Sequence, residues 1–319
     1  MNRFSLPLIM LTAVCLVAAT LSPSQAATLK HTWVASFGDN SNTCDISAPC
    51  ATFAGAYNKT DVGGEITCIN SGNYSQVVIS HSLSINCENA IGGNGIPLGA
   101  FNIIVTPGAD DYVILRGLDF DGTGTTIGGG QIDIGGAGVV HLQKIKINNW
   151  RGSGSGVNFT PNGPAKLFIS DCFITDNGSS GNAAGIYIKP SSGVQADVTI
   201  DRTRIENNFF GIVADGTGGG SIRGLVSDSV VSGNVNNGIT VTTSGPSVVF
   251  SIDRTAVTHN KYGLVAAGGA GMLVGNSTIA HNTTGLLAAF GGVLLSYKNN
   301  NLNANTTNDG VFSGVVGQQ

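Results

Sequence analysis

The chain has 319 residues, of which 47 are glycine and only 11% are charged. Collagen would need glycine at every third position, and a disordered low-complexity chain would not contain 41% hydrophobic residues, so the composition excludes both. A formal net charge of −4 gives no basic surface for nucleic acid. Because Val, Ile, Thr, Asn and Gly are abundant, the composition predicts an all-β protein with many turns.

The N-terminal segment has the features of a secretory signal peptide. Arg3 provides a positive charge, residues 6–21 are apolar, and residues 24–26 form a small-x-small cleavage site. No later window reaches about 18 apolar residues, so we expect no membrane anchor. We therefore expect residues 1–26 to be removed and residues 27–319 to be secreted, to the periplasm or to the outside of a bacterial cell.

Four cysteines near the N-terminal end form two candidate disulfides. Cys44 and Cys50 lie six residues apart in a polar segment, and Cys68 and Cys87 occupy equivalent places in two strand-like runs. In an oxidising compartment each pair would form a disulfide. The alternative for the second pair is two reduced thiols stacked in a core.

An internal repeat of about 26 residues covers most of the chain. Apolar anchor residues recur at spacings of 22 to 31 residues, with a large, mostly aliphatic residue five positions before each. Three positions after the anchor, six successive repeats contain asparagine, followed by a glycine and an apolar run. The anchors are Phe120, Ile147, Ile174, Ile205, Val231, Val257, Ile279 and Leu302, and the asparagines are Asn177, Asn208, Asn234, Asn260, Asn282 and Asn305.

Each repeat contains three short alternating apolar runs separated by turn residues. This pattern predicts a solenoid in which each strand bonds to its equivalents in the coils above and below. The asparagines would form a ladder at one bend, where we expect them to adopt a left-handed backbone, and the following glycine would avoid a Cβ clash. A propeller is the structural alternative, but its blades usually need about 40 residues.

The sequence also resembles a known family. The run CATFAGAYNKTDVGGEITCINSGNY at residues 50–74, the segment 77–87 and the run VILRGLDFDG at residues 113–122 are similar to the N-terminal end of bacterial secreted right-handed parallel β-helix proteins with the pectate-lyase-like fold. Many proteins of this group have no known activity. The resemblance implies a single-stranded right-handed parallel β-helix of about 8 to 10 coils, with a short amphipathic helix capping the first coil.

We expect one domain. Residues 27–75 would form its N-terminal cap and first strand, residues 76–310 its coils, and residues 311–319 its C-terminal end. The residues that fall on one face of the implied cap helix are Phe53, Ala56, Tyr57 and Thr60.

Aligned by the anchors, the outward positions form columns along the solenoid. Asp201 and Asp253 lie two coils apart in one column, roughly 9.6 Å from twice the strand spacing. Inverting glycosidases hold two carboxyl groups about 6.5–9.5 Å apart, so this pair is a candidate acid and base. The next column alternates in sign over five coils, which predicts a ladder of ion pairs; its residues are Lys144, Asp171, Arg202, Asp228 and Arg254.

Two further columns contain reactive side-chain types. His259 and His281 occupy adjacent coils, but no third metal ligand accompanies them, so we interpret them as turn residues and predict no metal site. Cys172 shares its column with Thr and Ser residues, which favours a small stacked residue over a nucleophile.

The catalytic motifs of related enzymes are incomplete. Hydrolases resembling polygalacturonases need Asn-Thr-Asp, Asp-Asp and Gly-His-Gly runs, and only the second occurs, at residues 110–111. Enzymes resembling pectate lyases use an arginine among calcium-binding carboxylates, and Arg116 with Asp119 and Asp121 is the nearest grouping. Ca²⁺ is therefore expected only if the chain is such a lyase, and no other cofactor is indicated.

The leading hypothesis is a secreted, non-catalytic scaffold whose long surface binds polysaccharide or another cell-surface partner. The alternative is a lyase or glycoside hydrolase acting on acidic polysaccharide, with Arg116, Asp119, Asp121, Asp201 and Asp253 as candidate catalytic residues.

Apolar residues also recur at outward positions, where they are exposed, covered by loops or part of a contact face. The apolar residues at 311–316 either cover the core end or pair with another chain, so an oligomer through the C-terminal end is a further hypothesis. The outward apolar residues are Ile114, Phe168, Leu225, Leu273, Tyr187, Val213, Val265, Leu287 and Phe312.

Overall fold

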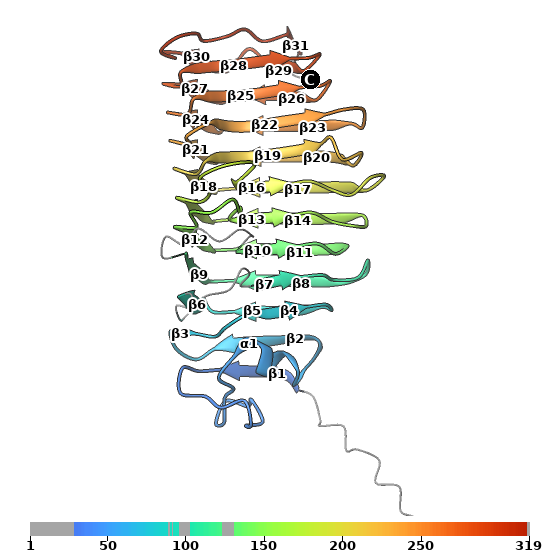
Figure 1. The fold of residues 1–319 in the computed structure, drawn as a ribbon, viewed down its shortest axis with the longest axis vertical. Helices are drawn as coiled ribbons and strands as arrows, with labels where there is room; N and C mark the ends of the chain where they lie inside the picture. The colour runs from blue at the N-terminus through green and yellow to red at the C-terminus, as the bar shows by residue number, and fades with distance from the viewer. Residues whose placement is uncertain (1–28, 89, 91, 96–102, 123–130, 318–319) are drawn as a thin grey trace, which may run out of the picture.

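A computed structural model describes residues 29–88, 90, 92–95, 103–122 and 131–317 of the chain. Within these residues, strands recur in a fixed order, and each pairs in parallel with the equivalent strand of the next coil. Figure 1 shows the coils stacked along the long axis, from the blue N-terminal strands at one end to the red C-terminal strands at the other. The predicted signal peptide lies outside the described residues.

The strands form three parallel sheets, which we name A, B and C. Sheet A has 12 strands, sheet B has 9 and sheet C has 10. Sheet A consists of β1 (Leu29–Val34), β2 (Thr60–Cys68), β5 (Leu83–Asn86), β8 (Tyr112–Arg116), β11 (Gly138–Gln143), β14 (Ala165–Ser170), β17 (Gln195–Asp201), β20 (Ser221–Ser227), β23 (Val248–Asp253), β26 (Gly271–Gly275), β29 (Val293–Ser296) and β31 (Gly314–Val315).

The other two sheets complete each coil. Sheet B consists of β4 (Val77–Ile79), β7 (Ile103–Val105), β10 (Ile132–Ile134), β13 (Val157–Phe159), β16 (Ala184–Ile188), β19 (Phe210–Gly216), β22 (Asn237–Thr243), β25 (Tyr262–Ala267) and β28 (Thr284–Ala289). Sheet C consists of β3 (Gly72–Asn73), β6 (Gly92–Gly95), β9 (Leu118–Asp121), β12 (Lys146–Asn148), β15 (Phe173–Thr175), β18 (Arg204–Glu206), β21 (Val230–Ser232), β24 (Ala256–Thr258), β27 (Thr278–Ala280) and β30 (Asn301–Asn303). The predicted all-β parallel solenoid is confirmed.

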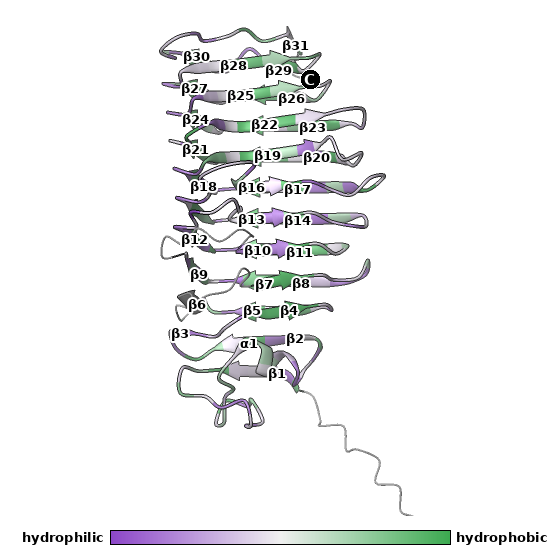
Figure 2. Cartoon of the chain, viewed as in Figure 1, coloured by the Kyte–Doolittle hydropathy of each residue, from purple (hydrophilic) through white to green (hydrophobic). Residues whose placement is uncertain are grey.

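The core runs through the middle of the stack, because strand residues alternate between inward and outward positions. In β14, Ala165, Leu167 and Ile169 are buried, whereas Lys166 and Phe168 point outward. Seven of the eight anchor residues are buried, and the last, Leu302, packs partly buried against the core. Figure 2 shows hydrophobic and hydrophilic segments mixed in the successive layers.

A short helix lies at the N-terminal end of the stack (Figure 1). It is α1 (Phe53–Tyr57), and its N-cap residue Thr52 accepts a hydrogen bond from the backbone N–H of Gly55. Phe53 and Ala56 are buried in the core, and Tyr57 packs against it.

Both predicted disulfides are confirmed. Cys44 is bonded to Cys50, and Cys68 is bonded to Cys87, with Cα atoms 4.7 and 4.8 Å apart respectively. The second bond joins the end of β2 to the residue after β5, so it links two neighbouring coils. Cys172 is buried and is not part of a disulfide.

The six repeated asparagines lie one above another after the strands of sheet C. Nδ2 of Asn208 donates to Asn234 Oδ1 at 3.2 Å, and the backbone N–H of Asn208 donates to the same oxygen at 3.0 Å. Nδ2 of Asn208 also donates to the carbonyl oxygen of Ile174 at 3.0 Å. The same bonds recur from Asn177 to Asn305, so each asparagine satisfies polar groups of two neighbouring coils.

The left-handed backbone lies one residue before each ladder asparagine. Asp176, His259 and Ala304 have φ of 57°, 59° and 57°, whereas no ladder asparagine has positive φ. The prediction that the asparagines themselves adopt this conformation is wrong, because their backbone N–H groups must point along the stack while the preceding residue turns the chain.

The glycine after the ladder is required by a close approach of neighbouring coils. A Cβ atom on Gly211 would lie 2.4 Å from the carbonyl oxygen of Gly238 and 3.0 Å from Asn234 Nδ2. Any side chain at this position would therefore separate the coils at the ladder.

Candidate functional site

The outward face of sheet A carries an aromatic stack. Ile114, His141 and Phe168 are direct neighbours on β8, β11 and β14. The ring centroids of His141 and Phe168 lie 4.6 Å apart, and the Tyr112 ring lies 4.8 Å from that of His141. We call Tyr112, His141 and Phe168 the aromatic stack. Burial lowers the pKa of His141 from its ordinary value of 6.5, so its imidazole is uncharged at neutral pH.

A row of polar side chains follows two residues further along the same strands. Arg116 Nε donates to Gln143 Oε1 at 2.9 Å, and Ser227 Oγ donates to Asp201 Oδ1 at 2.7 Å. Flat rings and hydrogen-bonding groups therefore lie side by side across several coils. The members of this polar row are Arg116, Gln143, Ser170, Asp201, Ser227 and Asp253.

The candidate acid and base residues, Asp201 and Asp253, lie in the polar row with Ser227 between them. Each carboxylate forms an ion pair with the arginine that follows it, Arg202 or Arg254. These fixed partners are typical of structural turn residues.

The charges in the neighbouring column form pairs. Arg202 Nε lies 2.9 Å from Asp171 Oδ1, and Arg254 Nη2 lies 2.8 Å from Asp228 Oδ2. All five residues of the column have φ between 44° and 56°, so they occupy the left-handed turn after sheet A. The fifth residue, Lys144, pairs outside the column, so the described contacts are separate ion pairs and not one continuous ladder.

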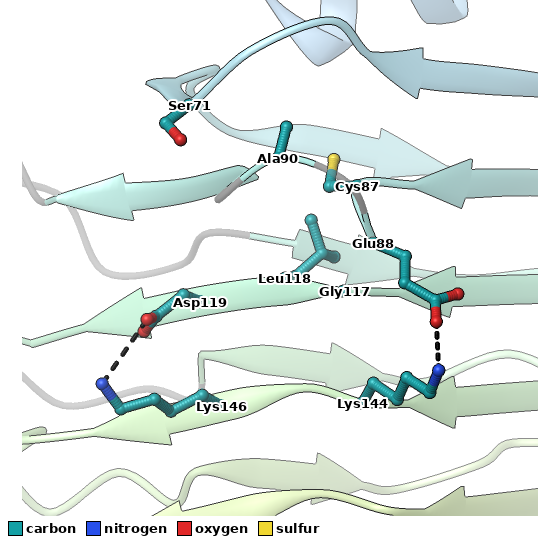
Figure 3. Close-up of a pocket in the computed structure, with 9 residues that line it drawn as sticks. All are labelled: Ser71, Cys87, Glu88, Ala90, Gly117, Leu118, Asp119, Lys144 and Lys146. Carbon is teal, nitrogen blue, oxygen red and sulfur yellow. Dashed lines mark hydrogen bonds and ion pairs between the residues drawn. The ribbon is translucent and has the colours of Figure 1, made fainter.

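A pocket of 490 Å³ lies at the turn between sheets A and C (Figure 3). Lys144 is ion-paired with Glu88 on one side, and Lys146 Nζ lies 3.4 Å from Asp119 Oδ2 on the other. The charged groups that line the pocket thus neutralise one another. The lining residues are Ser71, Cys87, Glu88, Ala90, Gly117, Leu118, Asp119, Lys144 and Lys146.

Gly117 explains why Lys144 pairs with Glu88. It lies on the coil between them, and a Cβ atom there would lie 2.5 Å from the Glu88 Cα atom. Without a side chain at this position, Lys144 reaches across one coil. Its hydrogen bond holds the pKa of Glu88 below the ordinary value of 4.5.

The five candidate catalytic residues form no single site. Asp119 lines the pocket, and Arg116 forms an ion pair with Glu88, which also lines it. Asp121 is the last residue of β9, and Asn149 Nδ2 lies 3.3 Å from its carboxylate. The other two are the last residues of their strands: Asp201 of β17 and Asp253 of β23. These strands lie three and five strands from β8, the strand that contains Arg116.

A partly buried cluster around Asp215 on sheet B was not predicted. Asp215 Oδ2 accepts hydrogen bonds from Tyr187 Oη and Lys189 Nζ, both at 2.9 Å. Burial would raise the pKa of Asp215, but hydrogen bonds from Thr217 and Lys189 outweigh it and hold the pKa below 3.8. The pKa of Tyr187 is raised, chiefly by burial, and that of Lys189 is raised by its bond to Asp215. Both remain protonated at neutral pH, which disfavours a role as general base.

The histidine pair and the free cysteine pack against neighbouring residues of the fold. His259 and His281 stack with ring centroids 5.3 Å apart. Burial raises the pKa of Cys172 to about 12, so its nucleophilic thiolate is not formed at neutral pH. Among the described residues, no group of three or more His, Cys, Asp and Glu side chains is placed to hold a metal ion.

The outward apolar columns are only partly exposed. Leu225 and Leu287 are exposed, whereas Val265 is buried at 8%. At the C-terminal end, Phe312 packs against the core, while Val311 is 82% exposed. In the part of the chain that the structure covers, no helix has the length and hydrophobicity to cross a bilayer.

Residues 184–318 match the family model described as the right-handed beta helix region. The crystal structure of pectate lyase Pel9A is 15% identical, with a TM-score of 0.65 over 92% of this chain and 79% of that chain. The chain is a right-handed parallel β-helix repeat protein. For this β-helix, the likeness at such low identity shows the fold and no activity.

A second structure is more distant from this β-helix. It is the A-module of mannuronan C-5 epimerase AlgE4 from Azotobacter vinelandii, with 11% identity and a TM-score of 0.38 over 81% of this chain and 91% of that chain. The comparison with curated proteins gave no match.

The sequence pattern predicts only part of the aromatic stack. Ile114 and Phe168 belong to a predicted outward apolar column, but His141 between them does not, because an apolar pattern omits histidine. Tyr112 lies two residues before Ile114 on β8 and is in register with Val139, so only the three-dimensional structure places its ring beside that of His141.

Proposed function

We propose that this protein is a secreted, non-catalytic scaffold that binds a polysaccharide on the outward face of sheet A. The aromatic stack beside the polar row carries this proposal. Sugar rings have one relatively apolar face and a rim of hydroxyl groups. They therefore fit a surface where uncharged rings lie next to amide, hydroxyl and carboxylate groups.

The parallel register adds rigidity to this surface. Each stack residue lies on a strand that pairs on both sides, so the position of its backbone is fixed by the coil below and the coil above. A binding site with little freedom to lose on association retains more of its contact energy.

The surroundings of the candidate catalytic residues support binding over catalysis. Asp119, Asp201 and Asp253 are each ion-paired with a neighbouring basic side chain. The acidic and basic groups are also distributed over distant coils. Secretion is supported by the two disulfides, since such bonds persist in oxidising compartments.

Calorimetric titration with neutral and uronate-rich polysaccharides tests the proposal. We expect Tyr112→Ala and Phe168→Ala to weaken binding about tenfold each, because each removes a stacked ring. Phe37→Ala is the matched control, since Phe37 is 70% exposed and lies outside sheet A. New reducing ends or unsaturated products would contradict the non-catalytic role, and equal binding by all three variants would contradict the assigned surface.

A further inference from the structure

A hollow of 430 Å³ lies at the far end of the same face of sheet A, on β23, β26 and β29. Gly275 creates it, because the residue opposite Asp253 in the parallel register has no side chain. A Cβ atom on Gly275 would lie 2.9 Å from Tyr297 Cδ2 and 3.7 Å from Asp253 Oδ1. The hollow therefore separates an aromatic ring from a carboxylate. Its lining residues are Ser251, Ile252, Asp253, Leu273, Gly275, Asn276 and Tyr297.

The polar groups of this hollow are fixed by bonds to one another. Asn276 Nδ2 donates to Asp253 Oδ1 at 2.8 Å, and Asn276 Oδ1 accepts from Asn299 Nδ2 at 2.9 Å. Arg254 forms an ion pair with Asp253 Oδ2. Each carboxylate oxygen can accept a further hydrogen bond, since it has more than one lone pair. The carboxylate is thus a rigid acceptor.

The charge balance favours an uncharged ligand. Arg254 is already paired with both Asp253 and Asp228, so it offers little attraction to a new anion. A ligand carboxylate at this place would meet the negative charge of Asp253. Sugar hydroxyl groups, in contrast, would donate to Asp253 while the sugar ring packs against Tyr297.

We propose that the hollow between Asp253 and Tyr297 binds one neutral pyranose unit of the polysaccharide. Its volume lies within the range of about 300–1,000 Å³ that is usual for ligand pockets. This inference rests on the proposed scaffold function and adds a sugar class and a specific subsite to it.

Titration with defined oligosaccharides tests the subsite. The probes are hexamers of β-linked glucose, mannose and xylose, with hexagalacturonate as the acidic comparison. We expect Tyr297→Ala and Asp253→Asn to weaken binding of at least one neutral probe about tenfold or more and to leave hexagalacturonate binding unchanged. Thermal unfolding of each variant checks that the coil remains folded.

The outcomes separate the subsite from the scaffold. If Tyr112→Ala weakens neutral binding and Tyr297→Ala does not, the subsite is wrong and the scaffold stands. If Tyr297→Ala weakens only hexagalacturonate binding, the sugar class is wrong. If the wild-type protein binds no polysaccharide at all, both proposals fail. Phe37→Ala again serves as the matched aromatic control.

Discussion

Asn305 donates to Asp309 Oδ1 through its side-chain Nδ2 at 2.8 Å and through its backbone N–H at 3.0 Å. These are the two bonds that each ladder asparagine makes to the next one. Asp309 therefore takes the place of a seventh ladder residue and accepts the hydrogen bonds of Asn305, the last asparagine of the ladder. At the other end, Asn177 Oδ1 accepts from the backbone N–H of Trp150 at 3.3 Å.

The end of the ladder gives a first prediction. Asp309→Asn keeps the acceptor oxygen and should change stability little, whereas Asp309→Ala leaves the donors of Asn305 to solvent and should cost about 1 kcal/mol. Urea unfolding of both variants measures the difference. Equal losses would show that the carboxylate, and not its place in the ladder, matters.

A mid-ladder substitution should cost more. Asn234→Ala removes the acceptor for two buried donors of Asn208 and leaves the Ile205 carbonyl oxygen without its side-chain donor. We expect a loss of about 3 kcal/mol in unfolding free energy. Because solenoids can unfold in parts, hydrogen exchange of the Asn208 amide should be measured as well. Asn303→Ala is the control, since Asn303 is exposed; an equal effect there would contradict the ladder account.

The close approach of coils predicts the effect of glycine substitutions. Gly211→Ala forces a Cβ atom against the Gly238 carbonyl oxygen and should destabilise the protein by about 1–3 kcal/mol. Gly135→Ala is the matched control, because a Cβ atom there meets nothing within 4 Å. Chemical denaturation of the pair tests the prediction, and a stable Gly211→Ala variant would be the contrary result.

The repeat makes the fold predictable from the sequence, whereas contacts that do not follow the repeat could not be predicted. Anchors such as Ile205 recur once in every repeat, so their burial follows from the stacking of equivalent strands. The contact of Lys144 with Glu88 skips a coil and depends on the missing side chain of Gly117, which no column pattern contains. Asp215 meets Tyr187 from a different position in the coil, so column alignment could not bring them together.

The position of the left-handed residue was missed for a different reason. Asparagine tolerates positive φ, so its recurrence at the same place in six successive repeats suggested that the asparagines occupy the bend. The residue that does so varies between Asp176, His259 and Ala304, and it gives no common signal. The sequence predicts the ladder residues, whereas the direction of their backbone follows only from the three-dimensional structure.

The partly buried cluster around Asp215 predicts that the free energy of unfolding is highest at intermediate pH and falls at both low and high pH. The pKa of Asp215 lies below 3.8, so its stabilising effect is complete above that pH and is lost as pH falls through the lowered value. The pKa values of Tyr187 and Lys189 lie above 10.0 and 10.5, so their effect is lost as pH rises beyond those values. Thermal unfolding across pH, with Asp215→Asn as comparison, measures it; an unchanged acid limb in that variant would contradict the assignment.

The ion pairs after sheet A predict a salt-dependent effect. Arg202→Asp places a carboxylate beside Asp171, Asp201 and Asp228, whereas Arg202→Gln only removes the positive charge. Raising the salt concentration from about 0.01 M to about 1 M shortens the Debye length from about 30 Å to about 3 Å, so repulsion between these exposed carboxylates should fade. We expect the Asp variant to unfold at lower urea than the Gln variant in low salt, and the two midpoints to converge in high salt. A gap that stays constant with salt would mean that packing of the arginine side chain, and not its charge, stabilises this turn.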